Sequence, residues 1–279
     1  MKGDAMNTFD YLNEYYNTHD EDVRLSPKRG QVEFFTTVRY IGKYLKAGMK
    51  ILEIGAGTGR YSHYFARAGY VVDAVELIPH NIEIFRGNAR SDEKITITEG
   101  NATDLSAYAD HAYDITLLLG PMYHLFTEAE KKQALSEAVR VTKPGGLLFV
   151  AYCMNDATVI QYGFMRGNLL NGAEMKKGLV DMKTFRLSST PEELFVLHRK
   201  EDIDAFDEAL PVRRLHFVGT DMFTRYIADT VEAMDDRTYA LYLNYHFAVC
   251  ERADLVGLSN HTLDILQKYG ENDVIPKEE

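Results

Sequence analysis

A glutamate and three glycines stand together in the segment EIGAGTG at residues 53–59. Glycines here permit a tight turn and let a ligand lie against bare backbone. A helix that begins directly after the turn presents unpaired N–H groups to that ligand. Dinucleotide enzymes hold a pyrophosphate there, but their glycines are spaced G-x-G-x-x-G rather than G-x-G-x-G. Glu53 would repel a pyrophosphate and suits an ammonium group instead, held directly or through water.

Two further polar positions follow the next predicted strands. Glu76 ends the second strand, where a carboxylate can accept hydrogen bonds from both hydroxyls of a ribose. Asn101 follows the third strand and can hydrogen-bond an exocyclic amine, while Ala102 offers its N–H. Taken singly, Glu76 is also compatible with a solvated strand-end charge, and Asn101 with an ordinary polar loop. Because the carboxyl ends of parallel strands meet at one edge of the sheet, their coincidence with the glycine loop predicts an adenosyl site.

The period of the apolar residues predicts the elements that position these groups. Short apolar runs predict strands at 49–54, 71–77, 94–99, 113–119 and 147–152. Helical spacing, caps and Pro79 predict helices at 31–46, at 60–68, from 79 onward, and from the Thr127–Glu130 capping box to 141. The apolar residues of 7–24 are also close to helical spacing, and residues 143–146 are predicted to form a turn. Strands that alternate with helices predict an α/β fold with a parallel sheet covered on both faces.

The pattern is less regular after Cys153. Residues 155–210 are predicted to be helical and irregular, and the end of the chain is predicted to hold a strand at 212–218, one long amphipathic helix at 223–250 and a last strand at 258–266. We therefore divide the chain into an N-terminal helical cap (1–48), a ligand-binding core (49–153), a helical lid insertion (154–211) and a C-terminal part of the same domain (212–279).

Composition excludes some classes of partner. The net charge of −11 argues against phosphate-driven binding of nucleic acid. Two isolated cysteines, Cys153 and Cys250, make neither a disulfide framework nor a zinc site, which favours a reduced, cytoplasmic protein. The N-terminus lacks the apolar run of a signal peptide, and no apolar run approaches the ~18 residues of a membrane helix. We expect no nucleic-acid or membrane partner, and leave monomer and homodimer open.

Five ordered segments resemble the class I S-adenosylmethionine (SAM)-dependent methyltransferases, a Rossmann-like superfamily. They are ILEIGAGTGRYS (51–62), VDAVEL (72–77), EGNATDL (99–105), YDITLLLG (113–120) and KPGG (143–146), and the resemblance covers about residues 30–153. It implies a seven-stranded, mostly parallel sheet whose last strand is antiparallel, with helices on both faces, N-terminal helices and a helical lid between strands five and six. It also implies SAM as cofactor and S-adenosylhomocysteine (SAH) as product.

The resemblance also implies which residues contact SAM. These are Glu53, Gly55, Ala56, Gly57, Glu76, Leu77, Asn101, Ala102 and Leu119. An aspartate is commoner in the family where Asn101 stands, but an amide still serves as a partner for adenine. Tyr16, in a cluster with Tyr11 and Tyr15, is expected to close over the sulfonium, although a core-facing stripe is the alternative. Arg29 or Arg24 is expected to reach the SAM carboxylate.

The loop after the fourth strand, residues 119–124, is expected to lie beside the methyl group of SAM. Methyl transfer is an in-line displacement, so a base is needed only for a nucleophile that arrives protonated. Tyr123 and His124 are the candidate catalytic residues: His124 to deprotonate a hydroxyl or thiol, Tyr123 to pack against the methyl group or hydrogen-bond the substrate. Structural packing of both is the alternative. Leu119 stands where metal-dependent relatives need a carboxylate, so we expect no metal. The later histidines, His246 and His261, are expected to be structural or surface residues.

The lid is expected to shape a small, partly apolar acceptor site. Its candidate lining residues are Met154, Tyr162, Phe164, Met165, Arg166, His216 and Phe217. The alternative is a helical cap without a role in substrate binding. The sequence therefore predicts a SAM-dependent methyltransferase acting on oxygen, sulfur or nitrogen of a small molecule. The alternatives are an RNA or protein methyltransferase, a non-catalytic SAM-binding module and, more distantly, a nicotinamide oxidoreductase.

Overall fold

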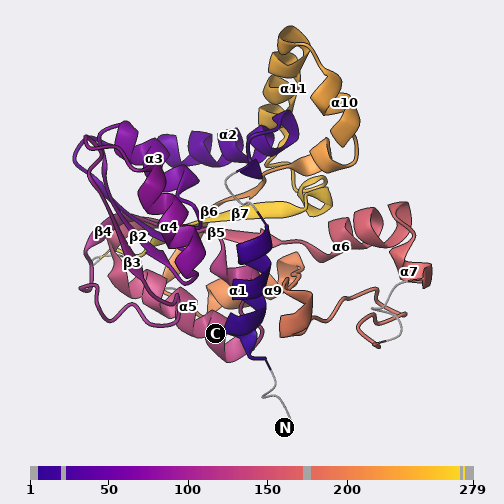
Figure 1. Cartoon of the computed structure of the whole chain (residues 1–279), viewed down its shortest axis with the longest axis horizontal. Coiled ribbons are helices and arrows are strands. Elements are labelled where there is room, and N and C mark those ends of the chain that lie inside the picture. The colour runs from indigo at the N-terminus through magenta and orange to yellow at the C-terminus, as the bar shows by residue number, and fades with distance from the viewer. Residues whose placement is uncertain (1–5, 20–22, 172–176, 271–272, 274–279) are drawn as a thin grey trace.

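A seven-stranded sheet forms the centre of the computed structural model, which describes residues 6–19, 23–171, 177–270 and 273 (Figure 1). The strand order is β3-β2-β1-β4-β5-β7-β6. The strands are β1 (Lys50–Ile54), β2 (Val71–Glu76), β3 (Ile95–Glu99), β4 (Tyr113–Leu118), β5 (Thr142–Cys153), β6 (Val212–Gly219) and β7 (His261–Lys268). β7 runs antiparallel to both of its neighbours, and the other pairs are parallel. The predicted fold class is confirmed.

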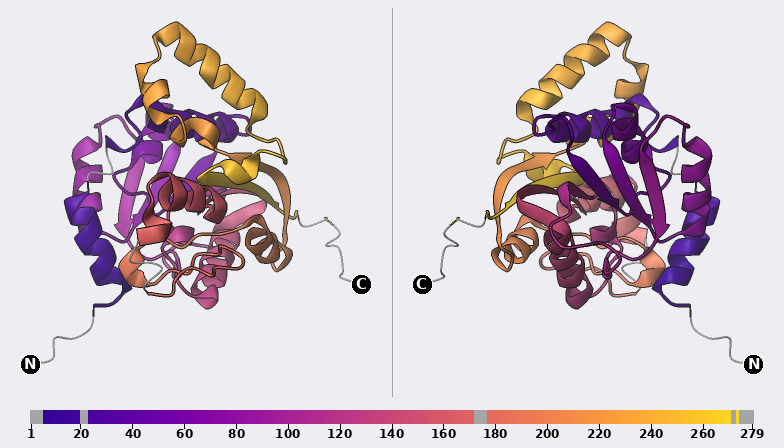
Figure 2. Two further views of the ribbon diagram at one scale, coloured as in Figure 1. Left: turned by 90° about the vertical axis from the view of Figure 1, so that its right-hand side faces the viewer. Right: turned by 90° about the vertical axis from the view of Figure 1, so that its left-hand side faces the viewer.

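Helices cover both faces of the sheet because consecutive strand residues are buried on opposite sides (Figure 2). On one face, Ile51 packs in the same core cluster as residues of α2 (Lys28–Gly42) and α3 (Arg60–Arg67). On the other face, Leu52 packs in a cluster with α5 (Glu128–Val141) and α9 (Lys200–Glu208). α4 (Pro79–Asn88) contacts β2 and β3.

The N-terminal helix α1 (Thr8–Thr18) is a separate element from α2. It begins with a capping box, in which Asn7 and Asp10 each accept a hydrogen bond from the backbone N–H of the other. It contacts α4 and the 3-10 turn η4 (Pro191–Glu193), so it bridges the core and the segment after β5. A predicted aromatic helix therefore sits next to the ligand-binding edge.

The single long helix predicted at 223–250 is wrong. The segment divides into the 3-10 turn η5 (Met222–Arg225), α10 (Ala228–Ala233) and α11 (Asp236–Val249). Met234 has extended backbone, and the Asp235 side chain accepts a hydrogen bond from the backbone N–H of Thr238. An N-cap of this kind starts a new helix, so apolar periodicity alone joined two helices that a cap separates. α10 and α11 stand out from the body at the top of Figure 1.

The predicted turn at 143–146 lies inside β5 rather than before it. The register with β4 shifts from Tyr113 opposite Thr142 to Ile115 opposite Leu147, so the residues between them bulge out of the ladder. Gly145 has φ +74°, which supplies the local reversal. The last strand begins later than predicted, because residues 256–258 form the 3-10 turn η6 (Val256–Leu258).

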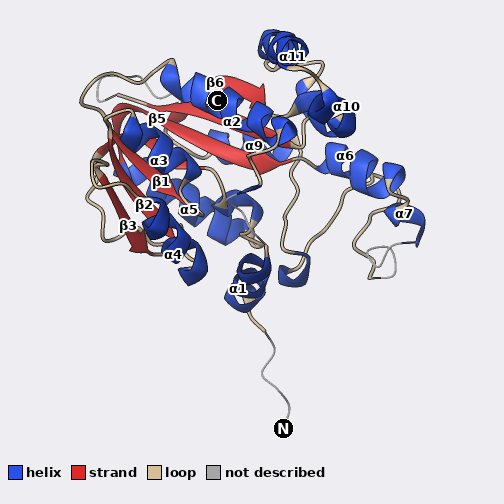
Figure 3. Cartoon of the chain, turned by 45° about the horizontal axis from the view of Figure 1, so that its top comes forward, coloured by secondary structure: helices blue, strands red, loops and turns tan. Residues whose placement is uncertain are grey.

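The segment after β5 is helical only in part (Figure 3). It contains α6 (Asn155–Thr158), the π-helix η3 (Val159–Met165) and α7 (Asn168–Asn171). In the described residues from 177 onward the segment is irregular, with isolated β-bridges between Val180 and Leu187 and between His198 and Met154. The predicted division of the chain into cap, core, lid and C-terminal part stays a prediction. Within the described ranges, no helix is both long and apolar enough to cross a membrane.

Candidate active site

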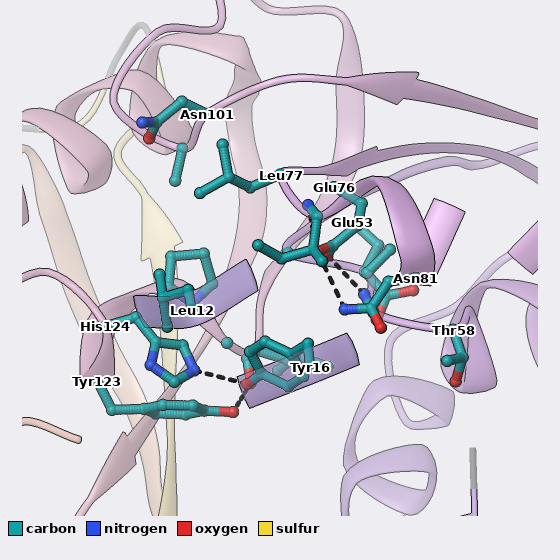
Figure 4. A pocket seen from close by; sticks show the side chains of 18 of the residues that line it. Leu12, Tyr16, Glu53, Thr58, Glu76, Leu77, Asn81, Asn101, Tyr123 and His124 are labelled. Atoms are coloured by element: carbon teal, nitrogen blue, oxygen red, sulfur yellow. Dashed lines mark hydrogen bonds between the residues drawn. The ribbon is translucent and has the colours of Figure 1, made fainter. Parts of the chain in front are cut away.

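A cavity opens at the carboxyl ends of β1, β2 and β4, and α1 covers part of it (Figure 4). Its empty volume is about 1300 Å³, including the part that is open to solvent. The predicted cofactor and catalytic residues that line it are Tyr16, Glu53, Gly55, Ala56, Gly57, Glu76, Leu77, Asn101, Ala102, Leu119, Tyr123 and His124. Groups that are far apart in the sequence thus surround one space, as the strand-end argument requires.

The glycine loop is held by the neighbouring strand. The backbone N–H groups of Gly55 and Ala56 both donate to the carbonyl oxygen of Val75, at 2.8 and 3.0 Å. Gly55 has φ +73°, and a Cβ added there would lie 2.6 Å from Cδ of Pro121 in the loop after β4. Position 55 therefore requires glycine for both its backbone conformation and its contact with the second loop of the site.

Glu76 is oriented by three donors. Its Oε2 accepts a hydrogen bond from the N–H of Gly57 at 2.8 Å, and its Oε1 accepts from the N–H of Ile78 at 3.0 Å and from Nδ2 of Asn81 at 3.3 Å. The side chain is buried, and this burial raises the pKa of the carboxyl although the hydrogen bonds lower it. Oε2, which accepts only one of these bonds, keeps capacity for a further donor such as a ribose hydroxyl. Sequence reasoning missed Asn81, whose only signal is its place in the first turn after Pro79.

Glu53 is a buried carboxyl that lies beside Glu76 in Figure 4. The hydroxyl of Ser62 in α3 donates to its Oε2. Burial raises the pKa of Glu53 to about 8, the nearby Glu76 adds to the rise, and the Ser62 hydrogen bonds oppose it. A cation placed next to Glu53 would stabilise its ionised form, so the site favours a positively charged ligand group at this point.

The side chain of Asn101 makes hydrogen bonds within the protein that the sequence does not indicate. Its Oδ1 accepts hydrogen bonds from the backbone N–H and the hydroxyl of Thr103, both at 3.0 Å. Because a backbone N–H only donates, the Oδ1 position is fixed and the amide NH₂ is the part left for a ligand. The expectation that Asn101 accepts from an exocyclic amine is therefore revised: its amide is arranged to donate, which suits a ring nitrogen.

Tyr16 and His124 form a hydrogen-bonded pair at the other side of the cavity. Nδ1 of His124 faces the carbonyl oxygen of Leu194 at 2.9 Å, so Nδ1 carries the proton and Nε2 accepts from the Tyr16 hydroxyl at 2.8 Å. Burial lowers the pKa of His124 to about 4, although the Leu194 hydrogen bond raises it. The histidine is therefore neutral at pH 7, and its one basic nitrogen is already occupied.

Tyr123 is also held by the protein. It belongs to the 3-10 turn η2 (Pro121–Tyr123), and its hydroxyl donates to the carbonyl oxygen of Leu119 at 2.8 Å. The Phe195 ring lies 6.1 Å from the Tyr123 ring and 5.1 Å from that of His124. Sequence reasoning missed Phe195, because nothing in the irregular stretch before α9 indicates that it packs against Tyr123 and His124.

Arg29 lies outside the cavity lining. Its backbone N–H and its guanidinium both donate to Glu232 near the end of α10, at 2.9 and 3.3 Å. The other arginine considered for this role, Arg24, does line the cavity. The structure therefore favours Arg24 over Arg29 as a contact for a ligand carboxylate. Further lining residues that the sequence did not indicate are Thr8, Phe9, Leu12, Arg60 and Tyr61.

The residues expected to line an acceptor site from the lid do not line this cavity. Met154 is buried in the core, and the side chains of Tyr162, Phe164, Met165 and Arg166 are exposed to solvent. His216 of β6 faces Tyr44 and Glu251, and Phe217 lies below Lys200 and Arg214. Strand β6 is at the far edge of the sheet, which explains why the last two residues are distant from the loop after β4. His246 is buried and hydrogen-bonded to Thr36, as a structural residue.

Comparisons with known proteins agree with this arrangement. Residues 52–150 match a protein family described as a methyltransferase domain. A demethylmenaquinone methyltransferase of Paenarthrobacter aurescens is 35% identical over 107 residues, which cover 38% of this chain and 40% of that protein. A ubiquinone biosynthesis O-methyltransferase of Methylocella silvestris is 30% identical over 189 residues, which cover 66% of this chain and 69% of that protein.

The fold comparison extends over most of the chain. A crystal structure of a SAM-dependent methyltransferase from Methanosarcina mazei has a TM-score of 0.55 and 19% identity, and the match covers 83% of this chain and 98% of that one. This likeness concerns the fold. The chain spans about two fifths of the length of the demethylmenaquinone methyltransferases that it matches.

Proposed function

Because this chain belongs to the class I SAM-dependent methyltransferases, we propose that it binds SAM in the cavity under α1 and transfers the methyl group to a small-molecule acceptor. The observation that carries the proposal is the convergence of Glu53, Glu76 and Asn101 on one cavity. These three residues come from the ends of three adjacent strands and match the charge and polarity of three parts of one cofactor.

The proposed placement of SAM follows from the hydrogen-bonding capacity of each residue. Adenine lies between Leu77 and the Asn101 amide, and the ribose hydroxyls donate to the Glu76 carboxylate. The amino group lies toward Glu53, whose ionised form it stabilises. The carboxylate of SAM lies toward Arg24, which can form a charge-assisted hydrogen bond with it.

This placement puts the sulfonium near Tyr16 on α1. Tyr16 lines the cavity, and its hydroxyl donates to His124. Oxygen lone pairs and aromatic faces both attract a sulfonium cation. We therefore assign Tyr16 a role in holding the cofactor and His124 a role in orienting Tyr16. Neither residue is assigned as a base, because the lone pair of His124 Nε2 is occupied.

The reaction itself is a single displacement. An acceptor oxygen, nitrogen or sulfur forms a bond to the methyl carbon while the carbon–sulfur bond breaks, and the electron pair stays on sulfur to give SAH. A proton on the acceptor leaves to solvent or to a base. The protein contributes mainly by holding the acceptor in line with the methyl group and by excluding water.

A small molecule is the favoured acceptor class. The net charge of −11 disfavours an RNA substrate. The similar proteins from Paenarthrobacter and Methylocella are named for demethylmenaquinone methylation and for ubiquinone biosynthesis, which supports a small organic acceptor. Calorimetric titration with SAM and SAH tests the proposal. We expect one site per chain with a dissociation constant between ~1 μM and ~1 mM, and no saturable binding would contradict it.

A further inference from the structure

Four large apolar side chains are exposed at the outer end of the segment that follows β5. Phe164 and Met165 end the π-helix η3, and Met182 and Phe185 belong to the turn at 181–186. Their exposed fractions are 58, 59, 53 and 36%. The rings of Phe164 and Phe185 lie 6.3 Å apart, which joins the two stretches into one surface. We call these four residues the apolar tip. None of them lines the cofactor cavity, so the proposed methyl transfer does not use them.

The apolar tip stays exposed although the same segment has a small core of its own. Val159, Leu169 and Val180 are buried in one cluster, and Leu187 packs against it. The apolar side chains of this segment are thus divided into a buried set and an exposed set. α6 and α7, with η3 between them, extend away from the sheet at the right of Figure 1, so the exposed set lies on a projecting part of the molecule. Contiguous exposed apolar surface marks a contact site for a protein or a membrane.

Hydrogen bonds fix the turn at 181–186. The Asp181 carboxylate accepts from the backbone N–H of Lys183 at 2.8 Å, and the Asp181 carbonyl oxygen accepts from the N–H of Phe185 at 2.7 Å. The buried side chain of Asn155 donates to the carbonyl oxygen of Phe185 at 3.0 Å. Phe185 has φ +54°, a conformation that is unfavourable for an L-residue and that the turn nevertheless maintains. The turn is therefore a defined structure that directs apolar side chains to solvent.

Two cations border the apolar tip. Arg166 follows Met165, and Lys183 follows Met182. Among the residues that the structure describes, neither cationic group has a hydrogen-bond or ion-pair partner. The other described cations between β5 and α9 form ion pairs with carboxylates, which are Lys177–Glu193, Arg186–Asp202 and Arg199–Asp156. The two cations beside the apolar tip are thus the ones available to an external anion.

The charge beside the apolar tip is positive although the whole chain is acidic. Asp181 is the acidic residue of the same turn, and setting it against Arg166 and Lys183 leaves one positive charge. Exposed charges more than a Debye length of about 8 Å apart are largely screened at physiological ionic strength. The net charge of −11 therefore has little effect on a projecting part of the molecule.

An apolar surface bordered by cations suits an anionic lipid membrane. Apolar and aromatic side chains enter the boundary between headgroups and acyl chains, and Lys and Arg attract anionic headgroups. A stable protein partner is disfavoured by size. The four side chains expose roughly 400 Å², whereas a standard protein interface buries about 800 Å² on each partner. A membrane contact needs no matching surface of that area.

We propose that the apolar tip attaches this protein peripherally to an anionic lipid membrane, with Arg166 and Lys183 beside the lipid phosphates. The sequence-based expectation of no membrane partner considered a signal peptide and a membrane-spanning helix, and a peripheral contact requires neither. The inference goes beyond the proposed function and does not depend on it, because neither SAM nor an acceptor takes part.

Vesicle sedimentation with the full-length protein tests the proposal. Vesicles of phosphatidylcholine are compared with vesicles that also contain phosphatidylglycerol. The tip variant combines Phe164→Ser with Met165→Ser. Its matched control combines Leu241→Ser with Tyr245→Ser, which removes two large side chains of similar exposure from α11. We expect wild type and the control to bind the anionic vesicles equally, and the tip variant to bind them at least ~10-fold more weakly.

Two further measurements separate insertion from charge attraction. The chain contains no tryptophan, so Phe164→Trp and Leu241→Trp each carry a single fluorescent reporter. Anionic vesicles should shift the emission of Phe164→Trp to shorter wavelength, because the indole leaves water, and should not shift that of Leu241→Trp. Arg166→Gln combined with Lys183→Gln should bind anionic vesicles ~10-fold or more weakly than wild type and lose the preference over phosphatidylcholine.

Four results overturn the inference. They are no binding of wild type to anionic vesicles at ~1 mM lipid, equal binding of wild type to both kinds of vesicle, wild-type binding by the tip variant, and unchanged emission of Phe164→Trp. Concentration-dependent self-association that the tip variant removes would assign the surface to a second copy of the chain and also overturn it. Thermal unfolding confirms that each variant is folded.

Discussion

The hydroxyl of Tyr16 donates a hydrogen bond to Nε2 of His124, which joins the N-terminal helix α1 to the loop that follows β4. The two residues are 108 positions apart in the chain, and the atoms are 2.8 Å apart. The carbonyl oxygen of Leu194 fixes the tautomer of the histidine from its other side. Three segments therefore meet at this point, and together they close the cavity where the sulfonium is proposed to lie.

Removing the Tyr16 hydroxyl should loosen this closure. A hydrogen bond of this type contributes about 0.5–1.5 kcal/mol, so Tyr16→Phe should weaken SAM binding by about 2- to 12-fold. Calorimetry measures the change. Tyr11→Phe, on the same helix but outside the cavity lining, is the matched control and should bind SAM as wild type does. Equal affinities for wild type and Tyr16→Phe would contradict the proposed role of the pair.

Binding of SAM should release a proton near pH 7. The carboxyl of Glu53 has a pKa of about 8 without ligand, mainly because of burial, and an adjacent ammonium favours its ionised form. Affinity should therefore rise as the pH increases from 6 to 7. Titrations in buffers of different ionisation enthalpy measure the protons released. Glu53→Gln should release none, and a wild-type protein that releases none would count against this placement of the ammonium.

Gly55→Ala should destabilise the protein more than Gly57→Ala does. Both glycines have positive φ, at +73° and +56°, so alanine is strained at each by roughly 1 kcal/mol. At Gly55 the new methyl group would also approach Pro121 to 2.6 Å, whereas nothing lies within 4 Å at Gly57. Urea denaturation should show an additional loss of about 1–3 kcal/mol for Gly55→Ala, as for an overpacked core. Equal losses would mean that the two loops do not pack as described.

The ion pairs of His261 should stabilise the fold in a defined pH window. Its pKa rises from 6.5 to about 10 on folding, because Glu33, Cys153 and Asp221 outweigh burial. A raised folded pKa contributes stability that is complete below pH 6.5 and is lost as the pH rises toward 10. The difference in unfolding free energy between wild type and His261→Gln should shrink over that range. A difference that stays constant with pH would show that the ring is not charged in the folded protein.

The sequence predicts the cofactor side of the cavity well because short strand-loop units position it locally. The residue types at 53, 55 and 76 constrain both backbone and charge, and the structure places all three at one cavity. It predicts the other side poorly, because Leu194 and Phe195 reach His124 and Tyr123 through irregular chain that has no period. The break at Asp235 is missed for a related reason, because an N-cap is a single-residue signal inside the apolar stripe that predicts one helix at 223–250.

The role of His124 shows what geometry adds to residue type. A histidine after β4 suggests a base, but base strength depends on burial and on what occupies each ring nitrogen. Those are tertiary properties, set here by Tyr16 of α1 and by Leu194. The same applies to His261, which is expected from the sequence to be a structural or surface residue and which the folded chain places between two carboxylates.

The central claim is that SAM binds with its ribose on Glu76, and calorimetry on three proteins tests it most directly. Wild type is compared with Glu76→Gln and with Glu99→Ala, which changes the exposed glutamate paired with Glu76 in the adjacent strand. We expect one site in wild type, unchanged affinity in Glu99→Ala, and affinity about 10- to 100-fold weaker in Glu76→Gln, because charge-assisted hydrogen bonds are lost. Thermal unfolding confirms that each variant is folded. Wild-type affinity in a folded Glu76→Gln protein, or no binding of SAM to wild type, would contradict the account.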